Sequence, residues 1–295
     1  MAKAIFRLSP IEAPALFDVH VNIGMTDSEG LSFGRQSGDH YLQLMETSNT
    51  AYACAFPPLL GDYYAANGAL QQWATHNPAA RGRILPFARL GGKSGPRPIR
   101  EMWQARQSIR SQLLPRKEEP VDLSGYAGVK LIPHMSGLPE AETFEQIAQL
   151  GVPVLVHGGI HSPPQWIVET ILPKMRTPLI IAHLGTFPGD ASLLNSALDL
   201  ALRYELIYLD TSGAWMANFI THAANRAPHK LLFGSDAPMM HPSTAWNHLA
   251  SAIRDDLLLE QIGYTNAASL FARWIEQHAF EQPLDLKKIG SEDSR

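Results

Sequence analysis

Eight short apolar runs recur along the chain, and they constrain its fold more than any other feature. Most of them are continuously apolar rather than alternating, which indicates parallel strands that are buried on both faces. We predict strands at residues 15–21, 50–56, 84–90, 126–132, 152–157, 178–183, 206–210 and 231–236. Between them, apolar side chains recur at the three- and four-residue spacing of a helix in residues 63–76, 143–150 and 191–204.

The alternation of strand and helix predicts an α/β protein, a (β/α)8 TIM barrel with its helices outside the strands. Such a barrel uses about 250 residues as one domain, so we expect residues 1–280 to form a single domain. The polar residues 281–295 are expected to be a frayed tail. The alternative is an open doubly wound sheet, which usually carries a glycine-rich phosphate turn after its first strand. Here that strand ends in His-Val-Asn-Ile-Gly, and we therefore prefer the barrel.

The composition excludes several classes of function. A hydrophobic content of 45% and a charged content of 18% are ordinary for a globular core. A net charge of -4 without a basic patch argues against nucleic-acid binding. No apolar stretch approaches the ~18 residues that span a bilayer, and no secretory leader is recognisable. The single cysteine, Cys54, cannot form an internal disulfide. We therefore expect a soluble cytoplasmic protein without membrane partners, and a homodimer stays open.

Three histidines and an aspartate lie at the carboxyl ends of predicted strands: His20, His157, His183 and Asp236. In a parallel barrel these ends share one mouth. Imidazoles and a carboxylate that converge there are suitable ligands for a borderline divalent metal such as zinc. The pattern therefore predicts one metal site and a metal-assisted enzyme.

Neighbouring residues refine this site. Because side chains alternate along a strand, Asp18, His20 and Asn22 are expected on one face, which makes Asn22 a further candidate ligand. Its neutral amide oxygen suits zinc poorly. Asp236 can hold the metal and act as general base towards water, or alternatively cap the following turn. His183 can bind the ion, or orient water and polarise a carbonyl from just outside it.

Two cations end the third and fourth predicted strands. Arg89 suits bidentate capture of a substrate carboxylate, or a structural ion pair. Lys130 has three interpretations: it binds an anionic substrate, it pairs with Asp236 or Asp210, or it is carboxylated and bridges two metals. The substrate is therefore predicted to be a small, anionic molecule. Long loops at residues 24–38 and 91–98 add further charges at the same mouth.

At this point the chain resembles a known family. The likeness covers roughly residues 15 to 275, and the segments that carry it follow in this order: FDVHVNIG, YAGVKLIP, VPVLVHGG, LIIAHLGTFP, LDTSG, LLFGSDAPM and YTNAASLF. The chain is similar to the amidohydrolase superfamily, and most closely to the amidohydrolase-related group that includes aminocarboxymuconate-semialdehyde decarboxylase, resorcylate decarboxylases and pyrone lactonases. The resemblance implies that His20 and His157 are metal ligands, that His183 helps to activate water or substrate, and that Asp236 is the aspartate of strand eight. It places Lys130 where binuclear members carry a carboxylated lysine.

The chain departs from that pattern at one position, because Asn22 stands where the superfamily has its second first-strand histidine. The resemblance then implies either one zinc ion held by His20, His157 and Asp236, or a site without metal, as in some lactonases of the group. The main hypothesis is a metal-dependent hydrolase of an amide, ester or lactone. The alternatives are a metal-dependent decarboxylase of an aromatic or unsaturated acid, a metal-independent lactonase, and a non-catalytic binding barrel.

Overall fold

The computed structural model describes residues 14–24, 36–58, 63–92 and 122–278. The described residues form the strands β1 (Leu16–Asn22), β2 (Thr50–Phe56), β3 (Ile84–Leu90), β4 (Gly128–Leu131), β5 (Val154–Val156), β6 (Leu179–Ile181), β7 (Ile207–Asp210) and β8 (Leu231–Leu232). These strands lie side by side in chain order, and every neighbouring pair is parallel. The predicted α/β barrel is confirmed.

The first strand meets the last, so that the barrel is nearly closed. The amide of Val19 donates to the carbonyl of Phe233 over 2.9 Å, and the amide of Asp236 donates to the carbonyl of His20 over 2.9 Å. A further bond joins the Asn22 amide to the carbonyl of Ala237 over 2.8 Å. We call residues 19–22 and 233–237 the β1–β8 seam.

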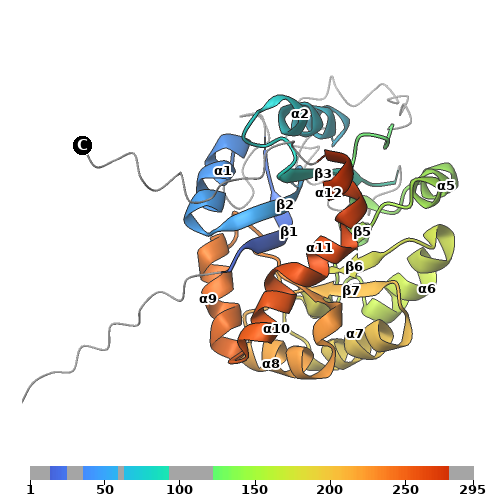
Figure 1. Cartoon of the computed structure of the whole chain (residues 1–295). Coiled ribbons are helices and arrows are strands. Elements are labelled where there is room, and N and C mark those ends of the chain that lie inside the picture. The colour runs from blue at the N-terminus through green and yellow to red at the C-terminus, as the bar shows by residue number, and fades with distance from the viewer. Residues whose placement is uncertain (1–13, 25–35, 59–62, 93–121, 279–295) are drawn as a thin grey trace, which may run out of the picture.

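Helices surround the strands, as Figure 1 shows. They include α1 (Gly38–Thr47), α2 (Tyr63–His76), α5 (Ala141–Leu150), α6 (Pro164–Met175), α7 (Ala191–Arg203), α8 (Ala217–Arg226) and α9 (Pro242–Ala252). Helix α7 illustrates why they form: Leu194, Ala197 and Ala201 recur on its buried face. The Asp190 carboxylate caps its first turn by accepting from two backbone amides.

The strands present alternate side chains to two different cores. Leu155 of β5 and Ile180 of β6 belong to a cluster inside the barrel. Their neighbours Val154 and Ile181 belong to the layer between strands and helices. Both faces are therefore buried, which explains why the strands are continuously apolar in sequence.

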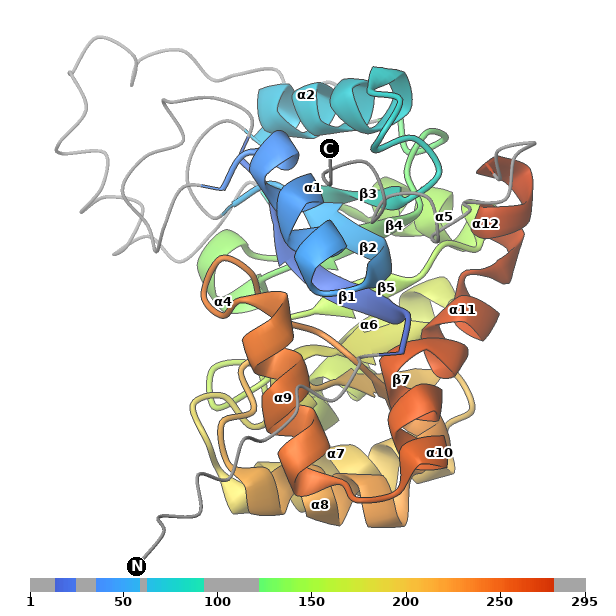
Figure 2. The ribbon, with the colours of Figure 1, turned by 60° about the vertical axis from the view of Figure 1, so that its left-hand side comes forward.

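The amino end of the barrel is closed by the last described helices. After α10 (Asp256–Glu260) and a π-helical turn η4 (Gln261–Thr265), the chain forms α11 (Asn266–Leu270) and α12 (Ala272–His278). The ring centroid of Phe271 lies 5.4 Å from that of Phe17 and 5.9 Å from that of Phe87, and both partners point into the barrel. Figures 1 and 2 show α11 and α12 crossing one end of the strands, while the short helix α4 (Pro133–Ser136) lies at the opposite end.

Some expectations concern residues outside the described ranges. These are the tail at 281–295 and the charged residues expected at the mouth from the loops at 24–38 and 91–98, namely Asp27, Glu29, Arg35, Lys93 and Arg97. Within the described ranges, no helix combines the length and apolar character needed to cross a membrane.

Candidate active site

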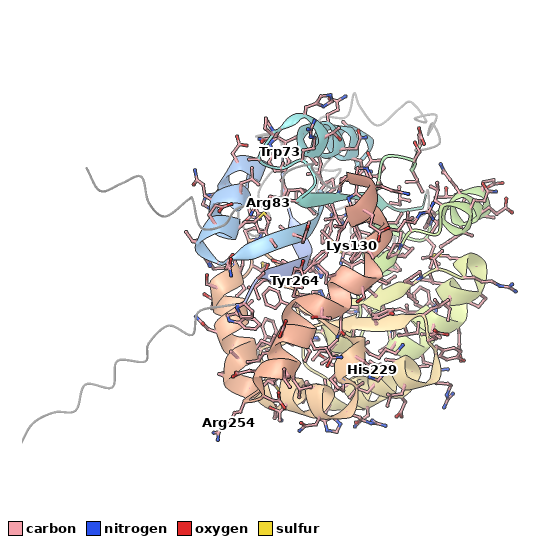
Figure 3. The ribbon with its side chains drawn as sticks, in the orientation of Figure 1. Trp73, Arg83, Lys130, His229, Arg254 and Tyr264 are labelled. Carbon is pink, nitrogen blue, oxygen red and sulfur yellow. The ribbon has the colours of Figure 1, made fainter. Side chains whose placement is uncertain are left out.

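The carboxyl end of the barrel brings together the side chains that the sequence singled out, with the His20 imidazole at the centre. His20 Nδ1 lies 2.8 Å from Asp210 Oδ2, and its Nε2 lies 3.3 Å from Lys130 Nζ and 3.5 Å from Asp236 Oδ1. These partners come from β7, β4 and the turn after β8. Figure 3 labels Lys130 within the outline of the strand ring.

A bulge in β1 decides which of its side chains reach this site. Asp18 pairs with Ala53 and Val21 with Ala55, so β1 carries one residue more than β2 over this stretch. The Asp18 carboxylate therefore contacts Tyr41 of α1, outside the barrel, whereas His20 points to the mouth. The expectation that Asp18 shares a face with His20 and Asn22 was wrong, because strict alternation does not hold across a bulge.

The hydrogen bonds of His20 determine which nitrogen faces the mouth. Burial alone would raise the pKa of Asp210, but the charge of His20 and its hydrogen bond hold that pKa well below the usual range of a carboxyl. The ionised Asp210 can only accept, so His20 Nδ1 donates to it, and in a neutral ring the Nε2 lone pair faces Asp236. A carboxylate behind an imidazole is the arrangement that orients metal-binding histidines.

His183 and His157 form a second pair of imidazoles. His183 Nδ1 lies 3.0 Å from the carbonyl of Ser212, which can only accept, so this nitrogen carries the proton. His183 Nε2 then accepts from His157 Nδ1 over 3.1 Å, which leaves the Nε2 lone pair of His157 uninvolved in this contact. Burial lowers the pKa of His183 to about 4, and burial with the neighbouring His183 holds the pKa of His157 far below its usual range. Both rings are therefore neutral at pH 7.

Arg89 and Lys130 are adjacent buried cations. They are register partners across β3 and β4, and each is 1% exposed. The Asn67 side chain holds the Arg89 backbone by bonds of 2.9 and 2.8 Å, while Arg89 Nη1 donates to the carbonyl of Pro57 over 3.3 Å. Burial lowers the pKa of Lys130 to about 8, although the charges of Asp210 and Asp236 oppose this shift.

Asp236 has a backbone conformation that few residues with a side chain adopt. Its φ of 61° lies in the left-handed region and ends the extended chain after β8. Asn22 Nδ2 donates to Asp236 Oδ1 over 3.2 Å and to the carbonyl of Ala237 over 3.4 Å. With two acceptors nearby, the amide nitrogen of Asn22 faces Asp236. Asn22 thus orients the carboxylate, and its role as a metal ligand stays a prediction.

Two further histidines, His134 and His161, lie near His157 at the mouth, whereas His241 does not. The His134 ring centroid is 4.9 Å from that of His157 and 5.4 Å from that of His161, so His134 and His161 extend the imidazole pair outwards. Phe187 lies 5.4 Å from His157 on another side. In contrast, the exposed His241 caps α9.

The donors fit a divalent metal. Among the described residues, His20, His183 and Asp210 form one buried group whose potential ligand atoms lie within 4.8 Å of one another. Asp210 is already engaged, because Oδ2 accepts from His20 and Oδ1 accepts from the amide of His183 over 3.0 Å. The Nε2 atom of His20 and the Oδ1 atom of Asp236 are therefore the ligand pair that the mouth offers, and neutral imidazole with carboxylate suits zinc.

Two residues of this network were missed from the sequence as functional residues. Asp210 was considered only as a partner of Lys130, and Ser212 was not considered. The Ser212 hydroxyl lies 2.9 Å from Nδ1 of both His20 and His183, and it donates to Asp210. The signal was present, because LDTSG ends an apolar run in the same way as the segments around His157 and His183.

A family model described as amidohydrolase matches residues 30–273. The chain belongs to the amidohydrolase family. Members of this amidohydrolase family are enzymes, either hydrolases or decarboxylases, that act on small molecules and usually bind a divalent metal. No curated protein matches the sequence at a significant level.

Solved structures share the fold of this amidohydrolase. A probable 2-pyrone-4,6-dicarboxylic acid hydrolase from Acinetobacter baumannii, with citric acid bound, is 18% identical, with 88% of this chain and 100% of that chain covered and a TM-score of 0.57. A 2,6-dihydroxybenzoate decarboxylase from Rhizobium is 15% identical, covering 88% and 99%, with a TM-score of 0.55. A 5-carboxyvanillate decarboxylase from Sphingomonas paucimobilis is 14% identical, covering 88% and 99%, with a TM-score of 0.57. At these identities the likeness establishes the fold alone.

Proposed function

We propose that this chain is a hydrolase that cleaves an amide, ester or lactone bond of a small carboxylate-bearing molecule, with one divalent metal ion, zinc. The observation that carries the proposal is the line Asp210–His20–Asp236. Asp210 holds one imidazole nitrogen at 2.8 Å, and the other lies 3.5 Å from the Asp236 carboxylate. This arrangement fixes a nitrogen lone pair beside a carboxylate oxygen, which is a suitable ligand pair and a suitable base.

The residues divide the work between binding the ion and moving protons. His20 and Asp236 would hold the ion, with His157, the third ligand predicted from the sequence, and Asn22 as weaker candidates. When bound, a divalent metal polarises a carbonyl and lowers the pKa of water from about 15.7 towards about 7. Asp236 accepts the proton of the attacking water and returns it to the leaving group. His183 fixes the tautomer of His157 and assists in orienting the water.

Arg89 and Lys130 bind the substrate carboxylate in this proposal. Two adjacent cations inside the barrel create a positive potential that attracts an anion, and the surrounding low dielectric strengthens that attraction. The 2-pyrone-4,6-dicarboxylic acid hydrolase of similar fold has citric acid bound, which is consistent with an anionic substrate here.

The second candidate is decarboxylation of an aromatic or unsaturated acid, and the Lys130 ammonium is the observation that favours it. Its Nζ atom lies 3.3 Å from His20 Nε2, and burial lowers the Lys130 pKa to about 8. Lys130 is therefore a proton donor near neutral pH, as protonation of carbon after loss of carbon dioxide requires. Hydrolysis is preferred because neutral imidazoles and a carboxylate act as bases, and because paired cations stabilise a substrate carboxylate instead of releasing it.

One set of assays separates these functions. Purified protein is analysed for metal, stripped with a chelator and reloaded with zinc. It is then given carboxy-lactones, carboxy-esters and N-acyl amino acids in a pH-stat, and hydroxybenzoates in a carbon dioxide assay. We expect about one zinc per chain and acid release that depends on zinc. Full activity of the stripped protein would instead indicate a metal-independent lactonase, and carbon dioxide release without acid release would establish the decarboxylase.

The decisive variant is Asp236→Asn. Asparagine tolerates the left-handed backbone of this position but cannot accept the proton. We expect kcat to fall by roughly 1,000-fold, in the range for removal of a catalytic acid–base group, at an unchanged melting temperature. Asp190→Asn, at the cap of α7, is the matched control and should leave kcat unchanged. Retention of activity in Asp236→Asn would refute the assignment of the base.

A further inference from the structure

The Asp18 carboxylate is fully buried behind the mouth and accepts four hydrogen bonds. Oδ1 accepts from the amide of His20 over 3.2 Å and from the amide of Ser235 over 2.9 Å. Oδ2 accepts from the Tyr41 hydroxyl over 2.9 Å and from the Ser235 hydroxyl over 2.5 Å. None of these bonds involves a side chain to which the proposed chemistry assigns a role.

Three of the four donors belong to the chain segments that carry the two central site residues, and the fourth is the Tyr41 hydroxyl of α1. One is the amide of His20 itself, and two belong to Ser235, which immediately precedes Asp236. The Ser235 hydroxyl also accepts from the amide of Ala237 over 3.0 Å. A single carboxylate therefore links the backbone of His20 to the turn that contains Asp236, across the β1–β8 seam.

This turn needs such a link, because its conformation is unfavourable by itself. The left-handed region is unfavourable for a residue with a side chain, and such a conformation persists only where the surroundings hold it. Asp236 has a φ of 61°. The chain also passes very close to His20, since a Cβ atom on Gly234 would lie 3.0 Å from the His20 Cβ. Without the bonds to Asp18, the turn can relax and carry the Asp236 carboxylate away from the imidazole.

We propose that Asp18 is a positioning residue that sets the separation between His20 Nε2 and Asp236 Oδ1, and through it the affinity of the site for a divalent ion. The metal part rests on the function proposed above, whereas the separation does not. The Asp18 side chain lies on the outer side of β1, whereas His20 points into the mouth. The bulge in β1 allows these two nearby residues of one strand to point in different directions.

Two hydroxyls on the same carboxylate oxygen provide a matched pair of variants. Ser235→Ala removes the donor that belongs to the Asp236 turn, and Tyr41→Phe removes the donor that belongs to α1. Both variants delete one hydroxyl that is bonded to Oδ2. Asp18→Asn is the third variant, since it keeps the size of the side chain and loses one acceptor. Zinc affinity is measured by competition with a chromophoric chelator, and crystal structures are determined of the metal-stripped variants.

We expect Ser235→Ala and Asp18→Asn to weaken zinc binding about 10- to 100-fold, the usual effect of losing a residue that orients a ligand. In their stripped crystals, the separation of 3.5 Å should increase by about 1 Å, a misplacement that can cost 100-fold in rate. Tyr41→Phe should lower the melting temperature about as much as Ser235→Ala does. It should nevertheless leave zinc affinity within about twofold, because Tyr41 does not contact the Asp236 turn.

The outcomes distinguish failure of this proposal from failure of the proposed function. If the wild-type chain binds no zinc, the metal part of the proposed function fails, and the crystal separations alone decide the positioning role. If Asp18→Asn does not fold, Ser235→Ala decides it. An unchanged separation in Ser235→Ala, or equal losses of zinc affinity in Ser235→Ala and Tyr41→Phe, would overturn the positioning role.

Discussion

The two ends of this barrel are built from the same strands but differ in chemistry. At the amino end, Phe17 of β1 packs with Phe87 and with Phe271 of the closing helices. Three residues further along β1, His20 lies in a network of buried imidazoles, carboxylates and a lysine. Both ends are buried, yet one contains apolar rings and the other titratable groups.

This difference teaches that stability and chemistry are separated along the barrel axis. Apolar burial at the amino end contributes roughly 25 cal/mol per Å². At the carboxyl end, burial disfavours the charged forms, as the lowered pKa values of Lys130 and His183 indicate. The left-handed residues His183 and Asp236 lie at that end as well. The apolar end therefore supports strain that the mouth could not sustain by itself.

The largest expected effect on stability comes from the apolar end. Phe271→Ala removes a buried ring between two others and should lower the free energy of unfolding by about 3–5 kcal/mol. Activity per folded molecule should be unchanged, because the site lies at the opposite end. Chemical denaturation measures the first quantity, and Leu257→Ala on α10, where the side chain is 77% exposed, is the control. A loss of kcat in folded Phe271→Ala would show that activity at the carboxyl end depends on packing at the amino end.

A substitution at the mouth is expected to change the free energy of unfolding by less and in the opposite direction. Lys130→Met replaces a buried ammonium by an apolar side chain and should stabilise the metal-free protein by about 1 kcal/mol at pH 7, because the cost of burying the ammonium exceeds its attraction to Asp210 and Asp236. Folding lowers the Lys130 pKa from 10.5 to about 8, so the native state binds fewer protons than the unfolded chain between these values. Wild-type stability therefore rises with pH across that window, and the advantage of the variant should shrink.

Denaturation of both proteins at several pH values between 7 and about 10.5 measures that change. Lys174→Met, on the exposed surface of α6, serves as the control. If Lys130→Met destabilised the protein as strongly as Phe271→Ala, the buried charge at the mouth would stabilise the fold as much as the apolar end does, contrary to our expectation.

The smallest expected effect is the absence of a reaction at Cys54, which lies inside the barrel with no exposed surface. Burial raises the pKa of this thiol well above its usual value, so the native protein should not react with an aromatic disulfide reagent at pH 8. Labelling should occur at the rate of unfolding, and Phe271→Ala should accelerate it. Rapid labelling of the folded wild-type protein would show that the interior of the barrel is open to solvent.

The sequence predicted the fold well, because continuous apolar runs and helical spacing are local signals. Strands β2 and β3 agree with the predicted residues 50–56 and 84–90. The strands β6 and β8 were predicted too long, because the predicted segments extend to His183 and Asp236, where the backbone has already turned. Composition does not report where a left-handed residue ends a strand.

The site was predicted as a set of residues but not as a network. Convergence of His20 with Asp236 followed from the strand ends, and the structure shows the two side chains 3.5 Å apart. The outward position of Asp18 could not be anticipated, because a bulge depends on how β1 fits β2 and β8. The bonds between Asp18 and Ser235 join residues 217 positions apart, a distance at which single-sequence patterns carry no information.

That same span has a consequence for biosynthesis. None of the bonds between Asp18 and Ser235 can form until the ribosome has released the segment after β8, on the order of tens of seconds after β1 has emerged. During this interval the nascent half-barrel exposes apolar strand faces that only later partners cover. The enzyme's reactive groups are thus assembled last, and chaperone dependence in the cell should follow from how long this incomplete barrel waits.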